Sequence, residues 1–547
     1  AQQTQTTIVM MVTTTTTGTK WVLLFLLIAT SATIGSVYSL SMPPSNKNKV
    51  YDIVVIGGGS AGLTAAKFGA TFGKSVALVE KHRLGGDCTW TGCVPSKTLI
   101  AESKKKTSLS SSSSPKLLQN YKHDNNEWIN KVRNRLDKTR QTIYDKDDSK
   151  EVLEQLGIDC FEGNAFLVSS SLVEIQQQQS SSSFETDKNT QQELQLQAKY
   201  GIMIASGASP RPPDDTQIKG LASVDYVTYE EIFELEHLPK KLTVVGGGPV
   251  GCELSQALAR LGSNVTQIAP RLLPNEEDEI GDALEALFEA EGITRIKATV
   301  VQAQKEGTGG HVVSCKQAID GSDVSVSGDL LLLAVGRIPN VKGMGLQELG
   351  VLLNVNGGIM VDKNLQTTVK GIYAAGDCTG DKQFTHYAGY QGAIAARNIL
   401  LPLADPGVLD TVPAATFTTP EIASVGLTEA RAKELHGDNN VDVSIKYLED
   451  SDRAICEGTE TSGLIKIVYH AKNYKIFGAS IMSPAAAELI GIISVAMKTK
   501  LTFDMLATVT QIYPSYSSEL QIMAADVYYS KLTKNKRLYN TLKRVGL

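Results

Sequence analysis

The chain has 547 residues, 42% of them hydrophobic, and this length is enough for about three domains with their own cores. Its 53 lysine and arginine residues face 58 aspartate and glutamate residues and form no basic stripe, so a nucleic-acid partner is not expected. Seven cysteines are too few and too scattered for a disulfide scaffold, and only Cys88 and Cys93 stand close together.

An apolar segment near the N-terminus follows Lys20. Its core, WVLLFLLIA at Trp21–Ala29, leads into the small residues Thr30–Ala32, and this order is typical of a signal peptide. A signal anchor is the alternative, although a membrane span needs about 20 strongly apolar residues. We therefore expect residues 1–48 to be a targeting segment and linker that directs the protein to the secretory pathway or an organelle reached through it. Membrane contact is expected through this segment only.

Residues 51–81, YDIVVIGGGSAGLTAAKFGATFGKSVALVEK, predict a strand, a glycine turn, a helix of small residues and a second strand that ends in an acid. In such a turn one glycine permits the bend, one lets a pyrophosphate approach, and one packs helix on strand. Glu80 is placed to accept hydrogen bonds from a ribose diol. The predicted dinucleotide site contains Gly57, Gly59, Ser60, Ala61, Gly62 and Glu80.

In the segment Gly85–Lys97, GGDCTWTGCVPSK, four residues separate Cys88 from Cys93, a spacing that fits a metal half-site, a disulfide or an inert pair. No second cysteine pair or Cys/His cluster completes a zinc site, so no metal is expected. The pair follows a nucleotide-binding unit and opens a predicted helix, whose dipole lowers a thiol pKa. A dithiol beside a flavin can accept two electrons, and we favour this redox interpretation.

Two polar tracts, Ser108–Ser114 and Gln176–Gln192, predict surface insertions because they bury too little apolar area to order themselves. Between them, Trp128–Leu156 has the spacing of one or two solvent-facing helices. After about Pro413, the strand-like runs AATFTTPEIASVGL, LIKIVYH and YKIFGASIM and two further helical segments predict a separate α+β domain.

A second strand–turn–helix unit begins at Leu242 with LTVVGGGPVGCELSQALARLGSNVTQIAPR. Where an acid would hold a 2′-hydroxyl, the chain has Ala269, Pro270 and Arg271, which disfavours NADH. Arg271 can pair with the 2′-phosphate of NADPH, although a solvated surface arginine is the alternative. NADPH is therefore preferred, with NADH kept open. The glycines of this turn are Gly246, Gly248 and Gly251.

Taken together, these motifs resemble the class I pyridine nucleotide-disulfide oxidoreductases, the family of glutathione reductase, dihydrolipoamide dehydrogenase and mercuric reductase. The resemblance covers nearly all of Lys49–Lys536 and includes VVIGGGSAG, GGDCTWTGCVPSK, ASGASPRPP, VVGGGPVGCE, AVGRIPN, GIYAAGDCTG, HYAGYQG and FTTPEIASVGLTE. It implies an α/β fold of two Rossmann-like dinucleotide-binding domains, for FAD and NAD(P), and a C-terminal α+β dimerisation domain. The implied ranges are 49–215 and 341–410 for FAD, 216–340 for NAD(P) and 411–547 for dimerisation.

The resemblance also implies roles for individual residues. Asp377 contacts the ribityl or phosphate part of FAD, and Lys97 pairs with Glu253 beside the isoalloxazine ring. Cys93 is the thiolate that faces the flavin, and Cys88 exchanges with the substrate. The family forms homodimers in which each active site is shared. Further cofactor contacts are implied for Gly86, Lys97, Ser206, Gly207 and Gly336.

The C-terminal motif IYPSYSSEL departs from the family pattern. Glutathione reductase and dihydrolipoamide dehydrogenase have a catalytic histidine where this chain has Tyr513, and Ser518 stands at the position of the acid that follows, with Glu519 next to it. Tyrosine is a poor base at neutral pH but can donate a hydrogen bond, and a packing role is the alternative.

Mercuric reductase also lacks this histidine, but it delivers metal through a C-terminal cysteine pair. This chain ends KRLYNTLKRVGL and contains no Cys-x-x-Cys, so mercury reduction is not expected to be its native role. We expect an NADPH-dependent reductase of a small thiol-reactive, metal or quinone-like electron acceptor. A flavin-based redox sensor and a cysteine-independent diaphorase are the alternatives.

Overall fold

The computed structural model describes residues 49–111, 125–176, 194–307, 309–458, 463–534, 540–541 and 543–544. The expected targeting segment, residues 1–48, lies outside these ranges, and its role stays a prediction. Within the ranges, no helix is both long enough and apolar enough to cross a membrane.

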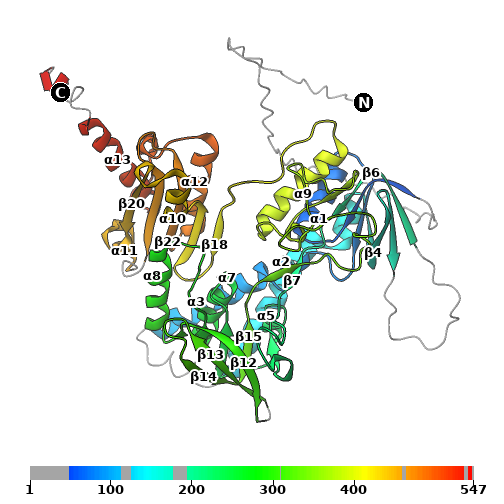
Figure 1. The fold of residues 1–547 in the computed structure, drawn as a ribbon, viewed down its shortest axis with the longest axis horizontal. Coiled ribbons are helices and arrows are strands. Elements are labelled where there is room, and N and C mark those ends of the chain that lie inside the picture. The colour runs from blue at the N-terminus through cyan, green and yellow to red at the C-terminus, as the bar shows by residue number, and fades with distance from the viewer. Residues whose placement is uncertain are drawn as a thin grey trace, which may run out of the picture. The chain divides into compact units, whose positions relative to one another are not determined.

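The first sheet is mostly parallel and carries the first glycine turn. Its strand order is β3-β2-β1-β6-β5-β4, with β17 paired to β6. Neighbouring parallel strands need a crossover, and α1 (Ser60–Thr71) provides it between β1 and β2. Helix α9 (Thr385–Leu400) packs beside α1 (Figure 1). The strands are β1 (Val50–Ile56), β2 (Val76–Glu80), β3 (Ile158–Glu162), β4 (Asn164–Ser169), β5 (Leu172–Gln176), β6 (Leu194–Ile204) and β17 (Ile372–Ala374).

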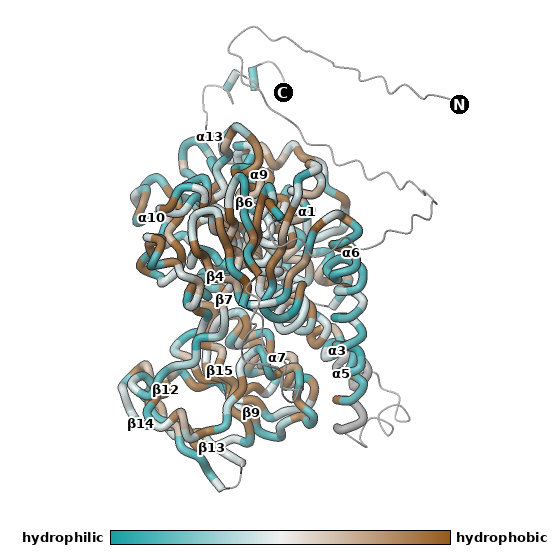
Figure 2. Tube along the Cα trace, turned by 90° about the vertical axis from the view of Figure 1, so that its right-hand side faces the viewer, coloured by the Kyte–Doolittle hydropathy of each residue, from teal (hydrophilic) through white to brown (hydrophobic). Residues whose placement is uncertain are grey.

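The cysteine segment and the predicted solvent-facing helices follow β2. Helix α3 continues through Ser108–Ser111, so the start of the first predicted insertion is helical, because an established helix extends at little cost. Figure 2 shows hydrophilic tube along α5 and α6 and hydrophobic tube along β6. The helices are α2 (Gly86–Trp90), α3 (Cys93–Ser111), α5 (Asn125–Ile143), the π-helical turn η1 (Tyr144–Asp148) and α6 (Lys150–Gln155).

The second sheet is also parallel, in the order β11-β10-β9-β15-β8. The LLLL strand, β15, pairs with β9 in this sheet, whereas β17 joins the first sheet. The strands are β8 (Tyr226–Val227), β9 (Lys241–Val245), β10 (Asn264–Ile268), β11 (Thr294–Ile296) and β15 (Leu330–Leu333), with α7 (Pro249–Leu261) and α8 (Asp278–Ala290). Two smaller antiparallel sheets are formed by β12 (Ala298–Glu306), β13 (Gly310–Gln317) and β14 (Asp323–Gly328), and by β7 (Ala208–Pro210) and β16 (Arg337–Pro339).

The third domain has an antiparallel sheet in the order β18-β19-β22-β21-β20. Alternate residues of β21 face two cores: Ile465 packs with α12 and α13, and Leu464 packs with residues of α7 and α8. The strands are β18 (Ala414–Thr416), β19 (Glu421–Gly426), β20 (Val441–Tyr447), β21 (Leu464–His470) and β22 (Ile476–Ser483). The helices are α10 (Glu429–His436), α11 (Asp452–Glu457), α12 (Ala486–Thr499) and α13 (Tyr516–Lys534). The predicted fold class, two Rossmann-like domains and an α+β domain, is confirmed, while the residue boundaries between domains stay a prediction.

Candidate active site

The first glycine turn leaves space for a ligand at one position and is closed by backbone at the others. A Cβ at Gly57 would lie 2.2 Å from Ala205 O, and one at Gly62 would lie 1.8 Å from Gly57 O. A Cβ at Gly59 would meet no atom of the described chain nearer than Gly86 Cα at 3.9 Å. Gly59 also precedes α1 without a side-chain cap, which leaves the N–H groups of the helix terminus available. The residues present fit a dinucleotide diphosphate at this turn.

Glu80 ends β2 beside the same turn. The backbone N–H of Gly58 donates to its Oε2 at 2.6 Å, and that of His82 donates to its Oε1 at 2.8 Å. These bonds orient the carboxylate predicted to hold a ribose. Ser60 begins α1 and its Oγ donates to Thr385 O at 2.9 Å, which ties α1 to the start of α9.

The second glycine turn repeats the contacts of the first. A Cβ at Gly246 would lie 2.2 Å from Ala334 O, and one at Gly251 would lie 2.4 Å from Gly246 O. A Cβ at Gly248 would have no described atom within 4 Å. The same close packing and the same open central glycine therefore occur at the start of α7, and they fit a second dinucleotide.

Arg271 lies between β10 and α8, next to the second turn. Its guanidinium pairs with Asp278, the first residue of α8, and Arg271 Nη2 is buried with no hydrogen-bond partner among the described atoms. Arg271, Asp278 and Lys297 line a cavity of about 350 Å³. Arg271, the residue predicted to bind the 2′-phosphate, therefore lies in a polar cavity. Its guanidinium already forms an ion pair with Asp278.

Cys88 lies in the short helix α2, and Cys93 is the first residue of α3. Cys93 Sγ is 3.3 Å from Thr385 Oγ1, at the start of α9. A hydrogen bond from the Cys88 thiol, with help from Thr385 and Lys97, lowers the pKa of Cys93 to about 6. The same hydrogen bond and burial raise the pKa of Cys88. When both cysteines are reduced, Cys88 therefore holds the proton and Cys93 is the thiolate.

Lys97 and Glu253 join α3 to α7. Lys97 Nζ donates to the two carboxylate oxygens of Glu253 at 2.9 and 3.1 Å, and the backbone N–H of Phe417 donates to Oε1 at 2.8 Å. The Glu253 side chain is only 6% exposed, so the pair and the added hydrogen bond offset the cost of burying its charge. The catalytic role assigned to the pair stays a prediction.

Asp377 lies beside Arg337, which the site prediction did not include. Arg337 Nη1 is 3.2 Å from Asp377 Oδ2, and its Nη2 donates to Asp87 Oδ2 at 2.6 Å. Burial raises the pKa of both Asp87 and Asp377, and the charge of Arg337 opposes this shift. Arg337 thus links the residue before Cys88 to the predicted FAD contact.

The remaining predicted residues occupy two places. Ser206 Oγ donates to Asn340 O at 2.6 Å, and Gly207 and Gly336 adopt positive φ angles of 69° and 116° that favour glycine. Tyr513 is 69% exposed in the third domain and donates to Asp452 Oδ2 at 2.9 Å. This hydrogen bond raises the pKa of Tyr513. The catalytic role of Tyr513 stays a prediction.

The chain combines two glycine turns that fit dinucleotides with a pair of cysteines whose pKa values differ. A flavoprotein that moves electrons from a nicotinamide to a disulfide needs these parts, so the fold and the site define the class of flavoprotein disulfide oxidoreductases. The family model for "Pyridine nucleotide-disulphide oxidoreductase" matches residues 51–392, and the model for the dimerisation domain of the same family matches residues 412–524. The chain belongs to the pyridine nucleotide-disulphide oxidoreductases.

Known relatives agree with this assignment. The chain is 32% identical over 484 residues to the mercuric reductase of Lysinibacillus sphaericus, covering 87% of this chain and 82% of that protein. It is 30% identical over 494 residues to the dihydrolipoyl dehydrogenase of Mycobacterium leprae, covering 86% and 97%. The solved HOCl-induced flavoprotein disulfide reductase RclA from Escherichia coli has a TM-score of 0.72 at 25% identity, covering 87% and 99%. The chain is an FAD-dependent NAD(P)H disulfide oxidoreductase.

Proposed function

We propose that this oxidoreductase takes electrons from NADPH into the Cys88–Cys93 pair and delivers them from Cys88 to a small thiol-reactive acceptor. The observation that supports the proposal is the unequal pair of thiols, with Cys93 lowered to a pKa of about 6 and Cys88 raised. When bound, FAD supplies the two-electron relay between the nicotinamide and the dithiol. Gly57, Gly59 and Gly62 would hold it.

The charge-transfer band of the reduced protein tests whether the Cys93 thiolate lies against the flavin. A thiolate against the flavin produces a long-wavelength band, so the two-electron-reduced protein should show this band above about pH 6 and lose it as Cys93 takes a proton below that pH. Anaerobic titration with NADPH across pH measures it. Cys93→Ser should remove the band, and Cys456→Ser, at an exposed cysteine, should keep it. A band that is missing at every pH would contradict the proposal.

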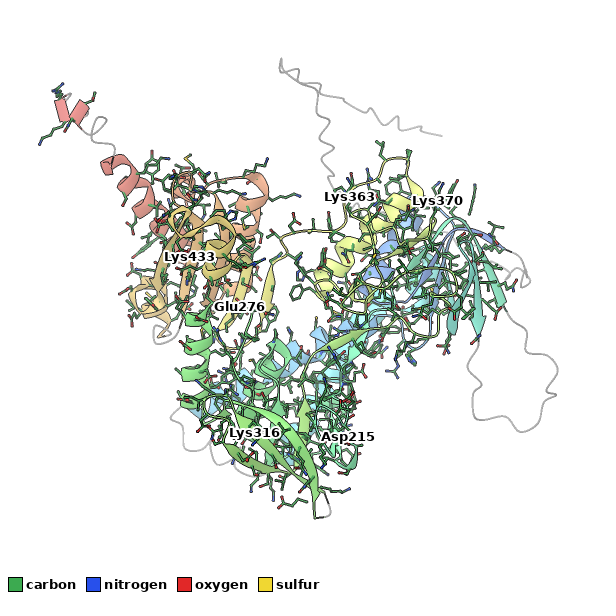
Figure 3. The ribbon with its side chains drawn as sticks, in the orientation of Figure 1. Asp215, Glu276, Lys316, Lys363, Lys370 and Lys433 are labelled. Carbon is green, nitrogen blue, oxygen red and sulfur yellow. The ribbon has the colours of Figure 1, made fainter. Side chains whose placement is uncertain are left out.

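We also propose a preference for NADPH, which rests on Arg271 in its polar cavity and on Pro270 where an acid would favour NADH. A hydrogen bond to a charged group contributes about 1.5–3 kcal/mol. Arg271→Ala should therefore weaken NADP⁺ binding about tenfold or more and leave NAD⁺ binding unchanged, as measured by calorimetry. Lys316→Ala, at an exposed lysine of β13 labelled in Figure 3, is the matched control. Equal weakening of both nucleotides would contradict the preference.

The match of residues 412–524 to the family's dimerisation domain supports a homodimer. Light scattering of the purified protein tests this directly, and a monomer at micromolar concentration would contradict it.

A further inference from the structure

An ion pair already occupies the cavity that the 2′-phosphate of NADPH is proposed to enter. The guanidinium of Arg271, between β10 and α8, pairs with the carboxylate of Asp278, the first residue of α8. Arg271 and Asp278 both line this cavity of about 350 Å³. The sequence pattern indicated Arg271 and gave no role to Asp278. In the folded chain the acid stands at one end of the guanidinium.

The other end of the guanidinium is packed but unpaired. Arg271 Nη2 is buried and has no hydrogen-bond partner among the described atoms, although buried polar groups normally have one. A Cβ at Gly281 would lie 3.3 Å from both Nε and Nη2 of Arg271, so a glycine of α8 makes the room in which the guanidinium lies. Glycine inside a helix is unfavourable relative to alanine, and this contact gives a reason for it here. Arg271 is therefore held in place, with Nη2 left for a ligand.

Two acids flank Asp278 in the chain, and both are bound to the third domain. Lys466 Nζ of β21 is 3.1 Å from Glu277 and 2.8 Å from Glu279. The backbone N–H of Glu429 donates to Glu277 Oε1 at 2.7 Å. These contacts hold the backbone on either side of Asp278, so less ordering entropy is lost when this acid forms its ion pair. The Asp278 side chain itself is 81% exposed and can turn into solvent when a ligand displaces it.

We propose that Asp278 is a specificity-determining residue that competes with the 2′-phosphate for Arg271 and so weakens the binding of NADPH. A phosphate monoester carries a charge of roughly −1.5 to −2 at neutral pH, and beside one guanidinium it repels the Asp278 carboxylate. NADH has a neutral hydroxyl at this position, so its binding does not depend on the ion pair. The inference rests on the proposed preference for NADPH, and it implies that this preference is smaller than Arg271 alone would produce.

Calorimetry with the oxidised holoprotein tests the competition. Asp278→Asn keeps the size of the side chain and removes its charge, so NADP⁺ should bind about threefold to fivefold more tightly, at the upper end of what an exposed ion pair gives. NAD⁺ binding should not change. Adenosine 2′,5′-bisphosphate should show the same gain and adenosine 5′-monophosphate should show none, because these two probes differ only in the 2′-phosphate. The gain should shrink as salt is added, since salt screens exposed charges.

Asp282→Asn is the matched control, because Asp282 lies on the same helix and lines the same cavity. It removes the same charge but leaves the pair of Arg271 and Asp278 intact, so NADP⁺ affinity should change by less than about twofold. Asp278→Glu keeps the charge and should bind both nucleotides like the wild type. Asp278→Ser also removes the charge and suits the start of a helix, so it should repeat the gain if Asp278→Asn does not fold.

Three results would overturn the inference. The neutral variants at position 278 could leave NADP⁺ binding unchanged, or they could tighten NAD⁺ binding equally. Asp282→Asn could give the same gain, which would show that the net charge of the cavity decides and not the ion pair. Failure of the proposed NADPH preference would look different, because Arg271→Ala would then weaken both nucleotides equally or neither of them. If Arg271→Ala weakens NADP⁺ binding alone and Asp278→Asn has no effect, only the inference on Asp278 fails.

Discussion

Cys88→Ser is expected to lower the reduction of thiol-reactive acceptors on the order of a thousandfold or more. The serine hydroxyl cannot form a mixed disulfide, and the loss of one nucleophile typically removes most of the catalysis that depends on it. The hydrogen bond with Cys93 and burial raise the pKa of Cys88, in the direction that keeps the proton on this sulfur. The measurement is steady-state NADPH consumption with a panel of disulfide, metal-ion and quinone acceptors.

The controls separate the three candidate roles. Cys456→Ser removes an exposed cysteine and should leave turnover unchanged. Turnover that survives Cys88→Ser would indicate a cysteine-independent diaphorase. A wild-type protein that reduces none of the acceptors would favour the redox sensor.

Lys466→Met is expected to lower the free energy of unfolding by about 3–5 kcal/mol, the cost of breaking a buried ion pair. Lys466 lies in β21 with a side chain that is 2% exposed, and its Nζ is 3.1 Å from Glu277, 2.8 Å from Glu279 and 2.8 Å from Glu429. Burial alone would lower the pKa of Lys466, but hydrogen bonds to the three carboxylates raise it above its ordinary value. Methionine would take this cation away from Glu277 and Glu279 and would leave Glu429 paired with Lys433 alone.

The pH dependence of this loss follows from the same charges. A lysine whose pKa is raised by folding contributes its full stabilisation at every pH below its pKa in the unfolded state. The wild type therefore retains this contribution throughout neutral pH. In the variant, protonation relieves the repulsion among the carboxylates, so the difference in unfolding midpoint should be largest near neutral pH and should shrink toward about pH 5.

Lys433→Met is the matched control for Lys466→Met. Lys433, labelled in Figure 3, pairs with the same Glu429, but its side chain is 40% exposed, so its loss should cost far less than the loss of Lys466. Thermal and urea unfolding of the holoprotein measure both variants. Equal effects would contradict the importance of burial.

The parts of the site that are formed by residues close together in the sequence were predicted as local motifs. Gly62 packs against the carbonyl of Gly57 within one strand–turn–helix unit, so the local pattern is enough to indicate the fold of that unit. Both cysteines lie in one short segment, so their pairing could likewise be predicted from the sequence. The partner of β15 came from the structure, because an apolar run indicates a buried strand but does not say which strand it pairs with.

Thr385 and Arg337 were missed because they approach the cysteine segment from distant parts of the chain. Thr385 lies 292 residues from Cys93, and Arg337 lies 250 residues from Asp87.

By itself, the sequence determined the family, the two nucleotide folds and the pair of sulfurs that carries the chemistry, because these depend on short motifs with specific spacing. The tertiary structure alone showed which distant side chains surround the two sulfurs. The physical reason is that a pKa depends on burial and on charges and hydrogen bonds acting through space, and Thr385 reaches Cys93 only once α9 has packed against the cysteine segment.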